Sequence, residues 1–333
     1  MEEVRRGVAK IAAVATIGLL GAGCHSKPKL ESYDPPGQLF KIDGRELHLY
    51  CTGEGSPTIV LVAGGGAYSI DWALVQPKIS EQTRVCSYDR AGLGWSDSGP
   101  ADETVEQTIA DLHNLLQAAR EKSPYVLVGA SIGGIYIRAY QRAYPSEVGG
   151  LVFSNSSNRV GMYVKGKADL IWNLTEDELR SAYPLPANTK GPVPTREEDP
   201  FDKLPVELQA TRLWLDRRSW EKWDPTKQGP ASMLSWRAEF LREFQETDDL
   251  TKRLLGQLSV IVVSSESAAG EAERQSHEGA AARLDFLSSN TKHITATGSG
   301  HEIHLYQPDV VEKALEQEML AVRYHQPLHP GSS

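Results

Sequence analysis

One segment constrains the fold of this chain more than any other, the run from Tyr125 to Gly134. It reads YVLVGASIGG, an apolar strand pattern followed by Gly-x-Ser-x-Gly-Gly and then a helical pattern. A nucleophilic serine must project from a sharp turn between a strand and a helix, and that turn tolerates little beside it. The helix start also puts the backbone N–H of Ile132 and the positive end of the helix dipole beside a developing oxyanion. The segment predicts that Ser131 is a nucleophile and that Ile132 is an oxyanion donor.

Short apolar runs alternate with helical patterns along most of the chain. The strand patterns are Glu46–Cys51, Thr58–Val62, Val85–Tyr88, Tyr125–Val128, Leu151–Ser154, Leu258–Val263 and Thr291–Ala296. Helical patterns cover residues 105–116 and 132–144, and a last helix opens at Pro308 with Val311, Leu315, Met319 and Val322 on its buried side. Such alternation predicts a mostly parallel sheet with helices on both faces.

The alternation stops between about Asn158 and Asp249. This stretch has helix-like spacing, no convincing strand, and five of the seven tryptophans: Trp172, Trp214, Trp220, Trp223 and Trp236. We interpret it as an inserted helical cap. The predicted organisation is two core segments at 39–157 and 251–323, the cap at 158–250, and a tail at 324–333.

The N-terminal residues have the pattern of an export signal. Basic residues precede an apolar run, Ile11 to Leu20, which ends in small residues and Cys24. The run is shorter than the roughly 20 residues that span a bilayer. The small residues before the cysteine resemble the lipobox of bacterial lipoproteins, which implies a signal peptide at 1–23, a lipid anchor on Cys24, a linker at 24–38, and a place in the bacterial cell envelope. A cleaved signal without lipid and a retained N-terminal anchor stay open.

Together with the serine turn, three further segments resemble the α/β-hydrolase family. The resemblance extends from about Leu39 to Val322, apart from the insertion. The three segments are Leu61-Val-Ala-Gly-Gly-Gly66, Tyr88-Asp-Arg-Ala-Gly-Leu-Gly-Trp-Ser-Asp97 and Gly298-Ser-Gly-His301. The resemblance implies an α/β-hydrolase fold, a mostly parallel eight-stranded sheet flanked by helices with an inserted cap. It also implies that Gly65 is the second oxyanion donor, although Ala63 replaces the usual histidine, and that Asp89 and Arg90 fix the sheet edge.

The general base of this family follows the last strand. A serine hydroxyl is a poor nucleophile until a base takes its proton. His301 fits this position, because it follows the strand at 291–296 and precedes the closing helix. His304 is the alternative, with a structural place on the short turn before Pro308 as its other interpretation.

The triad acid is less clear from the sequence. The family places it after the seventh strand, and Glu266 is the first carboxylate after Val263, slightly earlier than the pattern prefers. Glu271, Asp285 and the absence of an orthodox acid stay open. Some relatives carry the acid after the sixth strand, where this chain has Asn155, and asparagine cannot balance an imidazolium. We therefore expect Glu266 to orient His301.

Two cysteines remain besides Cys24, and disulfides persist in exported proteins. The family's strand order makes the strands that carry Cys51 and Cys86 neighbours. Adjacent strands lie about 4.8 Å apart, within reach of a disulfide. We expect a Cys51–Cys86 disulfide, with two reduced thiols as the alternative.

Charge and motifs narrow the classes of partner. The net charge is −9, from 35 basic and 44 acidic residues, which disfavours nucleic acid. The sequence has no His-Glu-x-x-His, Cys-x-x-Cys or phosphate-binding loop, so we expect neither metal nor cofactor. A lipid anchor is the one expected contact with a membrane.

These features together predict a carboxylic-ester hydrolase that acts through an acyl-enzyme on a small apolar substrate. A serine at the turn argues against the epoxide hydrolases and dehalogenases of this fold, which attack with aspartate. Two alternatives stay open: an amide or peptide hydrolase like the proline iminopeptidases, and a non-catalytic binding protein on the same fold.

Overall fold

The computed structural model describes residues 33–156, 161–164, 167–196, 198–248, 253–266 and 287–328. All of these belong to one unit that extends from Tyr33 to Ser333. The expected signal peptide and Cys24 lie outside the described residues. Every helix within the described ranges is too short or too polar to cross a membrane.

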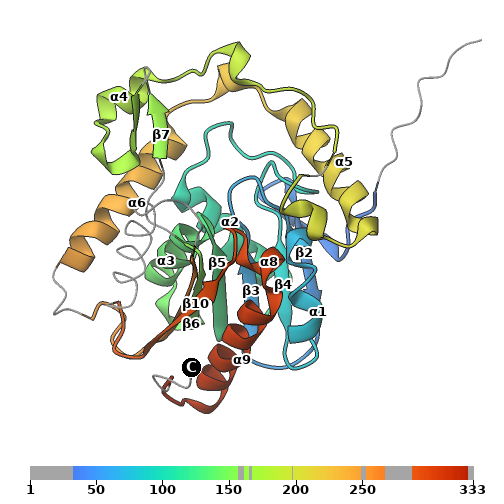
Figure 1. The fold of residues 1–333 in the computed structure, drawn as a ribbon, viewed down its shortest axis with the longest axis vertical. Coiled ribbons are helices and arrows are strands. Elements are labelled where there is room, and N and C mark those ends of the chain that lie inside the picture. The colour runs from blue at the N-terminus through green and yellow to red at the C-terminus, as the bar shows by residue number, and fades with distance from the viewer. Residues whose placement is uncertain are drawn as a thin grey trace, which may run out of the picture. The chain divides into compact units, whose positions relative to one another are not determined.

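The core is an eight-stranded sheet in the order β1-β2-β4-β3-β5-β6-β9-β10 (Figure 1). Strand β2 pairs antiparallel with β1 and β4, and the other five pairings are parallel. The strands are β1 (Gln38–Ile42), β2 (Arg45–Thr52), β3 (Thr58–Val62), β4 (Val85–Tyr88), β5 (Tyr125–Ala130), β6 (Val148–Ser154), β9 (Ser259–Glu266) and β10 (Thr291–Thr297). The predicted mostly parallel sheet is confirmed.

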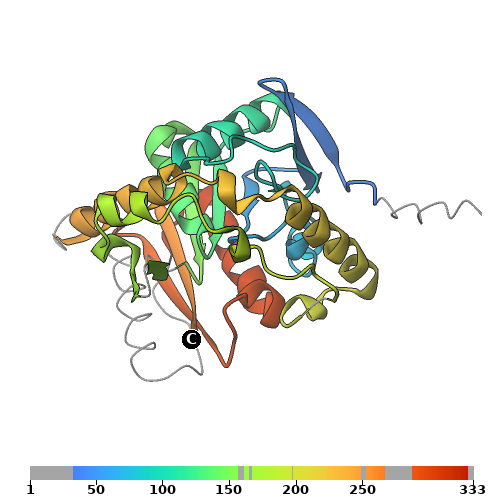
Figure 2. The same cartoon turned by 90° about the horizontal axis from the view of Figure 1, so that it is seen from above.

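Helices cover both faces of this sheet (Figures 1 and 2). Strand β3 shows why, because all five of its residues are buried and successive side chains enter different clusters. Val60 and Val62 pack with α2 (Val105–Ala118) and α3 (Gly133–Ala143). Ile59 and Leu61 pack in the cluster that includes residues of α1 (Gln76–Ile79), α8 (Ile303–Tyr306) and α9 (Pro308–Tyr324).

The last helix matches its sequence pattern. Pro308 begins α9, and the four predicted core residues Val311, Leu315, Met319 and Val322 are buried. Leu328, in the segment interpreted as a tail, is also buried, and its N–H donates to Oδ1 of Asn290 at 2.6 Å.

The segment between β6 and β9 forms a cap. Its larger elements are β7 (Gly161–Val164), β8 (Lys167–Leu170), α4 (Glu176–Ser181), α5 (Val206–Lys222) and α6 (Ala231–Asp248). The expectation that this insertion contains no strand was wrong, because β7 and β8 form an antiparallel hairpin. Each strand has four residues, too few for a period-two pattern to stand out in the sequence. Helix α6 packs on α2 and α3 of the core.

A buried arginine of the cap forms an ion pair with the core. Nε of Arg212, on α5, donates to Oδ1 of Asp71 at 2.8 Å, and its Nη1 donates to Oδ2 of Asp216 at 2.8 Å. Asp71 lies in a short 3₁₀ helix, Ser69–Trp72, just after β3 and its glycine turn. Burial raises the pKa of Asp71 to about 6, although Arg212 opposes the rise. The cap is therefore attached close to the end of β3.

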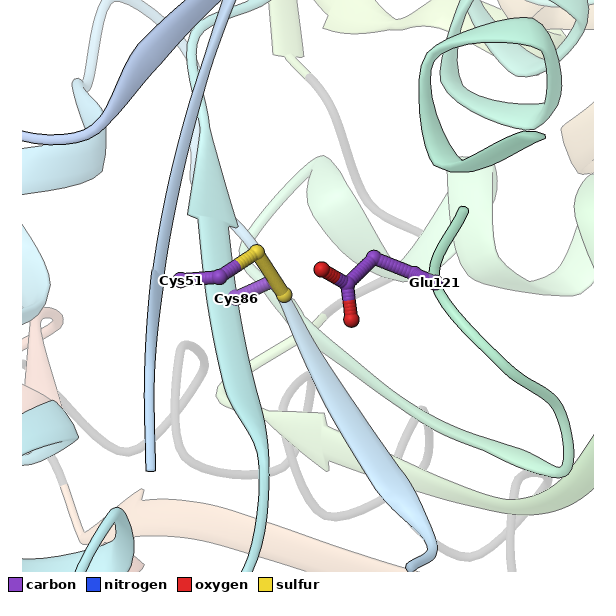
Figure 3. A group of neighbouring side chains, drawn as sticks. All are labelled: Cys51, Cys86 and Glu121. Carbon is purple, nitrogen blue, oxygen red and sulfur yellow. A yellow bond between two sulfur atoms is a disulfide. The ribbon is translucent and has the colours of Figure 1, made fainter. Parts of the chain in front are cut away.

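The antiparallel pairing of β2 and β4 places Cys51 opposite Cys86, with their Cα atoms 4.0 Å apart. The two residues form a disulfide, so this prediction is confirmed (Figure 3). The carboxylate of Glu121 lies beside the sulfurs. It accepts hydrogen bonds from Arg84 at 2.7 and 3.1 Å. Sulfurs bonded to each other are not thiolate ligands, so these three residues do not form a metal centre.

Candidate active site

The residues with predicted chemistry gather at one edge of the sheet. Gly65 follows β3, Arg90 follows β4, Ser131 follows β5 and His301 follows β10. Asn155 follows β6 at the same edge. These five positions all come just after the carboxyl ends of their strands, where ligands bind in open α/β sheets.

Ser131 occupies a strained turn between β5 and α3. Its φ is +51°, in the left-handed region that few non-glycine residues adopt, at a cost of about 1–3 kcal/mol. The turn is tight on both sides. A Cβ on Gly129 would lie 2.6 Å from the backbone carbon of Gly133, and one on Gly133 would lie 2.5 Å from the carbonyl oxygen of Val62. These distances agree with the expectation that the turn tolerates little beside the serine.

Two backbone N–H groups beside Ser131 are available as donors. Within the described ranges, the N–H groups of Gly65 and Ile132 have no backbone acceptor. Ile132 precedes the first residue of α3, so its N–H points away from the helix ladder. Gly64 is close to the serine, since a Cβ there would lie 3.3 Å from Cβ of Ser131. The turn after β3 and the helix start therefore flank the hydroxyl.

Arg90 holds this turn after β3. Its guanidinium donates through Nη1 to the carbonyl of Ala63 and through Nη2 to that of Gly64. The neighbouring Asp89 is fully buried and accepts the backbone N–H of Ser69 at 2.7 Å. The contacts agree with the interpretation that Asp89 and Arg90 fix the sheet edge.

His301 has an asparagine partner. Nδ2 of Asn155 lies 3.0 Å from Nδ1 of His301 and 3.0 Å from its carbonyl oxygen. Nε2 lies 4.0 Å from Oε1 of Glu302. The imidazole is half exposed, and its partial burial lowers the pKa of His301. In the part of the chain that the structure describes, no hydrogen bond joins His301 to Oγ of Ser131.

His304 is placed very differently. Its side chain is buried and stacks on Trp72, with ring centroids 4.4 Å apart. Burial, together with the charge of His301, lowers the pKa of His304 to about 3. A histidine that resists protonation so strongly is a weak base, so the environment favours His301.

The side chain beside Nδ1 of His301 is Asn155, whereas the sequence predicted Glu266 as the acid. Glu266 ends β9, where it pairs with Thr297 of β10, and its side chain lies outside the described residues, as do Glu271 and Asp285. Among the described side chains, the one that contacts Nδ1 of His301 is Asn155. Its position after β6 was visible in the sequence, but the lack of a charge on asparagine argued against a role.

A cavity of about 610 Å³ adjoins the serine turn. Gly65, Arg90 and Ile132 line it from the core. Three of the cap tryptophans also line it: Trp220, Trp223 and Trp236. Trp214 packs instead against Tyr33 and Trp95, and the side chain of Trp172 lies outside the described residues. The cavity is thus shared between the core and the cap.

The model of the family described as "Alpha/beta hydrolase family" matches residues 59–314. This match covers most of the chain, which therefore belongs to the α/β-hydrolase family. The predicted family and fold are confirmed.

Curated relatives match shorter segments. A 2-hydroxy-6-oxononadienedioate/2-hydroxy-6-oxononatrienedioate hydrolase of Paraburkholderia xenovorans is 32% identical over 114 residues, which are 32% of this chain and 38% of that protein. An uncharacterized protein of Schizosaccharomyces pombe is 33% identical over 154 residues, 37% of this chain and 29% of that protein. The chain spans about a third of the length of each of these two relatives.

Solved structures share the fold over most of their length. A thermophilic esterase from Thermogutta terrifontis has a TM-score of 0.60 at 17% identity, covering 86% of this chain and 98% of that one. An enol-lactonase from Burkholderia xenovorans LB400 has a TM-score of 0.56 at 18% identity, covering 84% and 98%. At such identities these similarities establish the fold alone.

Proposed function

We propose that the protein is a serine hydrolase that cleaves carboxylic esters through an acyl-enzyme intermediate. The observation that carries the proposal is the left-handed φ of Ser131 at the carboxyl edge of the sheet, between the available N–H groups of Gly65 and Ile132. A strained serine beside two such donors suits attack on a carbonyl carbon.

In the proposed reaction, Oγ of Ser131 attacks the ester carbonyl while Nε2 of His301 takes the hydroxyl proton. The N–H groups of Gly65 and Ile132 bind the oxyanion of the tetrahedral intermediate. The intermediate collapses, and the alcohol leaves with the proton from His301. Water then attacks the acyl-enzyme with His301 again as base, which releases the acid and restores Ser131.

The cavity beside the serine turn supports the proposed substrate class. Trp220, Trp223 and Trp236 give it a wall of large aromatic side chains, which favours apolar acyl or alcohol groups. The esterase and the lactonase among the structural neighbours agree with an acyl substrate. We therefore propose a small apolar ester.

The test is hydrolysis of a series of p-nitrophenyl esters of increasing acyl length, beside the matched p-nitroanilides. The proposal expects ester turnover that Ser131→Ala abolishes, and a preferred acyl length that changes when Trp220, Trp223 or Trp236 is replaced by alanine. Faster cleavage of the anilides would favour the amide hydrolase instead. Ester turnover that persists in Ser131→Ala would contradict the proposal.

A second candidate function is a non-catalytic binding protein. One observation favours it, the contact of an uncharged amide with His301 where a triad has a carboxylate. Such a protein would bind apolar esters without turning them over. Tight binding in the absence of both product release and covalent labelling of Ser131 would support this candidate.

We also propose that the protein is exported to the bacterial cell envelope and anchored through a lipid on Cys24. The Cys51–Cys86 disulfide supports export, because such bonds persist in oxidising compartments. Mass spectrometry of the mature N-terminus from a membrane fraction tests it. A diacylglyceryl-modified Cys24 as first residue is expected, and an unmodified Met1 would contradict both the cleavage and the anchor.

A further inference from the structure

The amide of Asn155 has three polar neighbours that determine which way it points. Its Nδ2 lies 3.0 Å from the carbonyl oxygen of His301 and 3.0 Å from Nδ1 of the same residue. Its Oδ1 accepts the backbone N–H of Ser265 at 3.3 Å. A carbonyl can only accept, and a backbone N–H can only donate. The NH₂ group must therefore face His301, because the reversed amide would set oxygen against oxygen and N–H against N–H.

Burial and the backbone hold Asn155 in this orientation. Asn155 and Ser265 are both buried. The backbone N–H of Asn155 donates to the carbonyl of Val263 at 2.7 Å, and its φ is +45°, in a region that asparagine tolerates better than most residues. Since a buried polar group that loses its partner is strongly disfavoured, the amide has one low-energy arrangement.

An imidazole nitrogen that receives a hydrogen bond must carry its lone pair. Nδ1 of His301 faces a donor, so the proton of the neutral ring is on Nε2. A serine triad needs the opposite tautomer, in which a carboxylate holds Nδ1–H and Nε2 is free to take the hydroxyl proton. We infer that Asn155 is a positioning residue that holds His301 in the Nε2–H tautomer, so that the free protein rests in a form that does not activate Ser131 and the proposed reaction starts from the minor Nδ1–H tautomer.

The charged groups around the ring agree with this assignment. Oε1 of Glu302 lies 4.0 Å from Nε2, on the side where the proton is assigned. His304 faces the other oxygen of Glu302 at 3.8 Å and stays neutral, because burial lowers its pKa. Arg212 offsets part of the charge of Glu302. In the described ranges, no carboxylate forms an ion pair with Nδ1 of His301.

The inference rests on the proposed function, in which His301 is the base for Ser131, but the tautomer can be measured without substrate. Nitrogen-15 NMR of the protein labelled at histidine distinguishes a protonated ring nitrogen from an unprotonated one, and His301→Gln identifies the signals. Above the pKa of His301 we expect Nε2 to be protonated and Nδ1 unprotonated. A proton on Nδ1 in the wild-type protein would overturn the inference.

A single exchange should convert the resting form into an active one. Asn155→Asp puts a carboxylate beside Nδ1, which favours Nδ1–H and raises the pKa of His301, although it also removes the N–H that donates to the carbonyl oxygen of His301. The reverse exchange costs a serine protease about 10⁴-fold in kcat, so we expect kcat/KM for an ester to rise by about 100-fold or more. The acid limb of its pH profile should move to higher pH. Asn290→Asp, the same exchange at the amino end of β10, should change neither quantity.

The outcomes separate the inference from the proposed function. A lower kcat/KM in Asn155→Asp would overturn the inference without contradicting the proposed hydrolase function. An Nε2–H tautomer in the wild-type protein, with no reaction of Ser131 in either protein, would support the tautomer and overturn the hydrolase. If Asn155→Asp does not fold, the wild-type NMR spectrum decides the inference alone.

Discussion

Arg90 donates through Nη2 to the carbonyl of Gly64, the residue before the proposed oxyanion donor Gly65. Its other terminal nitrogen donates to the carbonyl of Ala63, so one planar guanidinium holds two successive peptide groups of the turn. A fork of this kind fixes orientation as well as distance. The direction of the Gly65 N–H therefore depends on Arg90.

Arg90→Lys should impair turnover more than binding. Lysine keeps the charge but lacks the planar fork, so the turn would shift, and a displacement of about 1 Å near the chemistry costs on the order of 100-fold. We expect kcat to fall about 10- to 100-fold with a smaller change in KM. Arg84→Lys, one residue before β4, is the matched control. An unchanged kcat in Arg90→Lys would show that Arg90 does not position the oxyanion turn.

The two histidines should separate activity from stability. His301→Ala removes a half-exposed base, so activity should fall by orders of magnitude while the melting temperature changes little. His304→Ala empties a buried site against Trp72, so stability should fall by about 2 kcal/mol while the folded fraction keeps its kcat. Esterase assays measure the activity of both variants, and urea titrations measure their stability. The reverse pattern would make His304 the base.

The pH profile of kcat/KM should report the lowered pKa of His301. A base works only when unprotonated, so activity is lost as the pH falls through its pKa in the free protein. Because burial lowers that pKa, the acid limb should have its midpoint below 6.5, the ordinary value for histidine. A midpoint above 6.5 in the wild-type protein would indicate a nearby carboxylate, as Glu266 was predicted to supply.

Glu318 should make the folded protein less stable as the pH rises. Glu318 is fully buried on α9, and its Oε2 accepts a hydrogen bond from Oγ of Ser259 at 2.9 Å. Burial raises the pKa of Glu318 from 4.5 to about 8. Between these values the folded chain keeps a proton that the unfolded chain has lost, so stability falls as pH rises from about 5 to 8. Glu318→Gln should flatten that dependence, measured as melting temperature against pH. Glu316→Gln on the same helix is the control, and an equal slope in both would contradict the account.

The disulfide should contribute measurably to stability. It closes a loop of 35 residues between β2 and β4. Restricting the unfolded chain in this way stabilises a protein by about 3 to 4 kcal/mol in the loop-closure model. Guanidinium unfolding of the oxidised protein and of the Cys51→Ala, Cys86→Ala double variant measures the difference. Equal midpoints would show that the bond does not stabilise the fold.

The elements that the sequence predicted best are those that depend on residues close together in the chain. The five buried residues of β3 and the glycines around Ser131 are short-range signals, and both match the structure. The hairpin of β7 and β8 was not predicted, because its strands are too short for a periodic pattern to stand out. Strand β1, which adds an edge to the sheet through β2, was not singled out because only the last of its five residues is buried.

The site was harder to predict where it depends on orientation and on distant contacts. Asn155 was visible at the end of β6, but the direction of its amide depends on Ser265 and on the carbonyl of His301, both more than a hundred positions away. The stacking of His304 on Trp72 is likewise a tertiary contact. Glu266 was chosen as the first carboxylate after a strand, and its role stays a prediction.

The most direct test of the account is covalent labelling of Ser131. The folded wild-type protein and Asn155→Asp are each treated with a fluorophosphonate, and the adduct is mapped by mass spectrometry of peptides. We expect one adduct, on the peptide that carries Ser131, which forms more slowly in the wild-type protein than in Asn155→Asp and is absent from Ser131→Ala. An adduct that persists in Ser131→Ala, or none in either of the other two folded proteins, would contradict it.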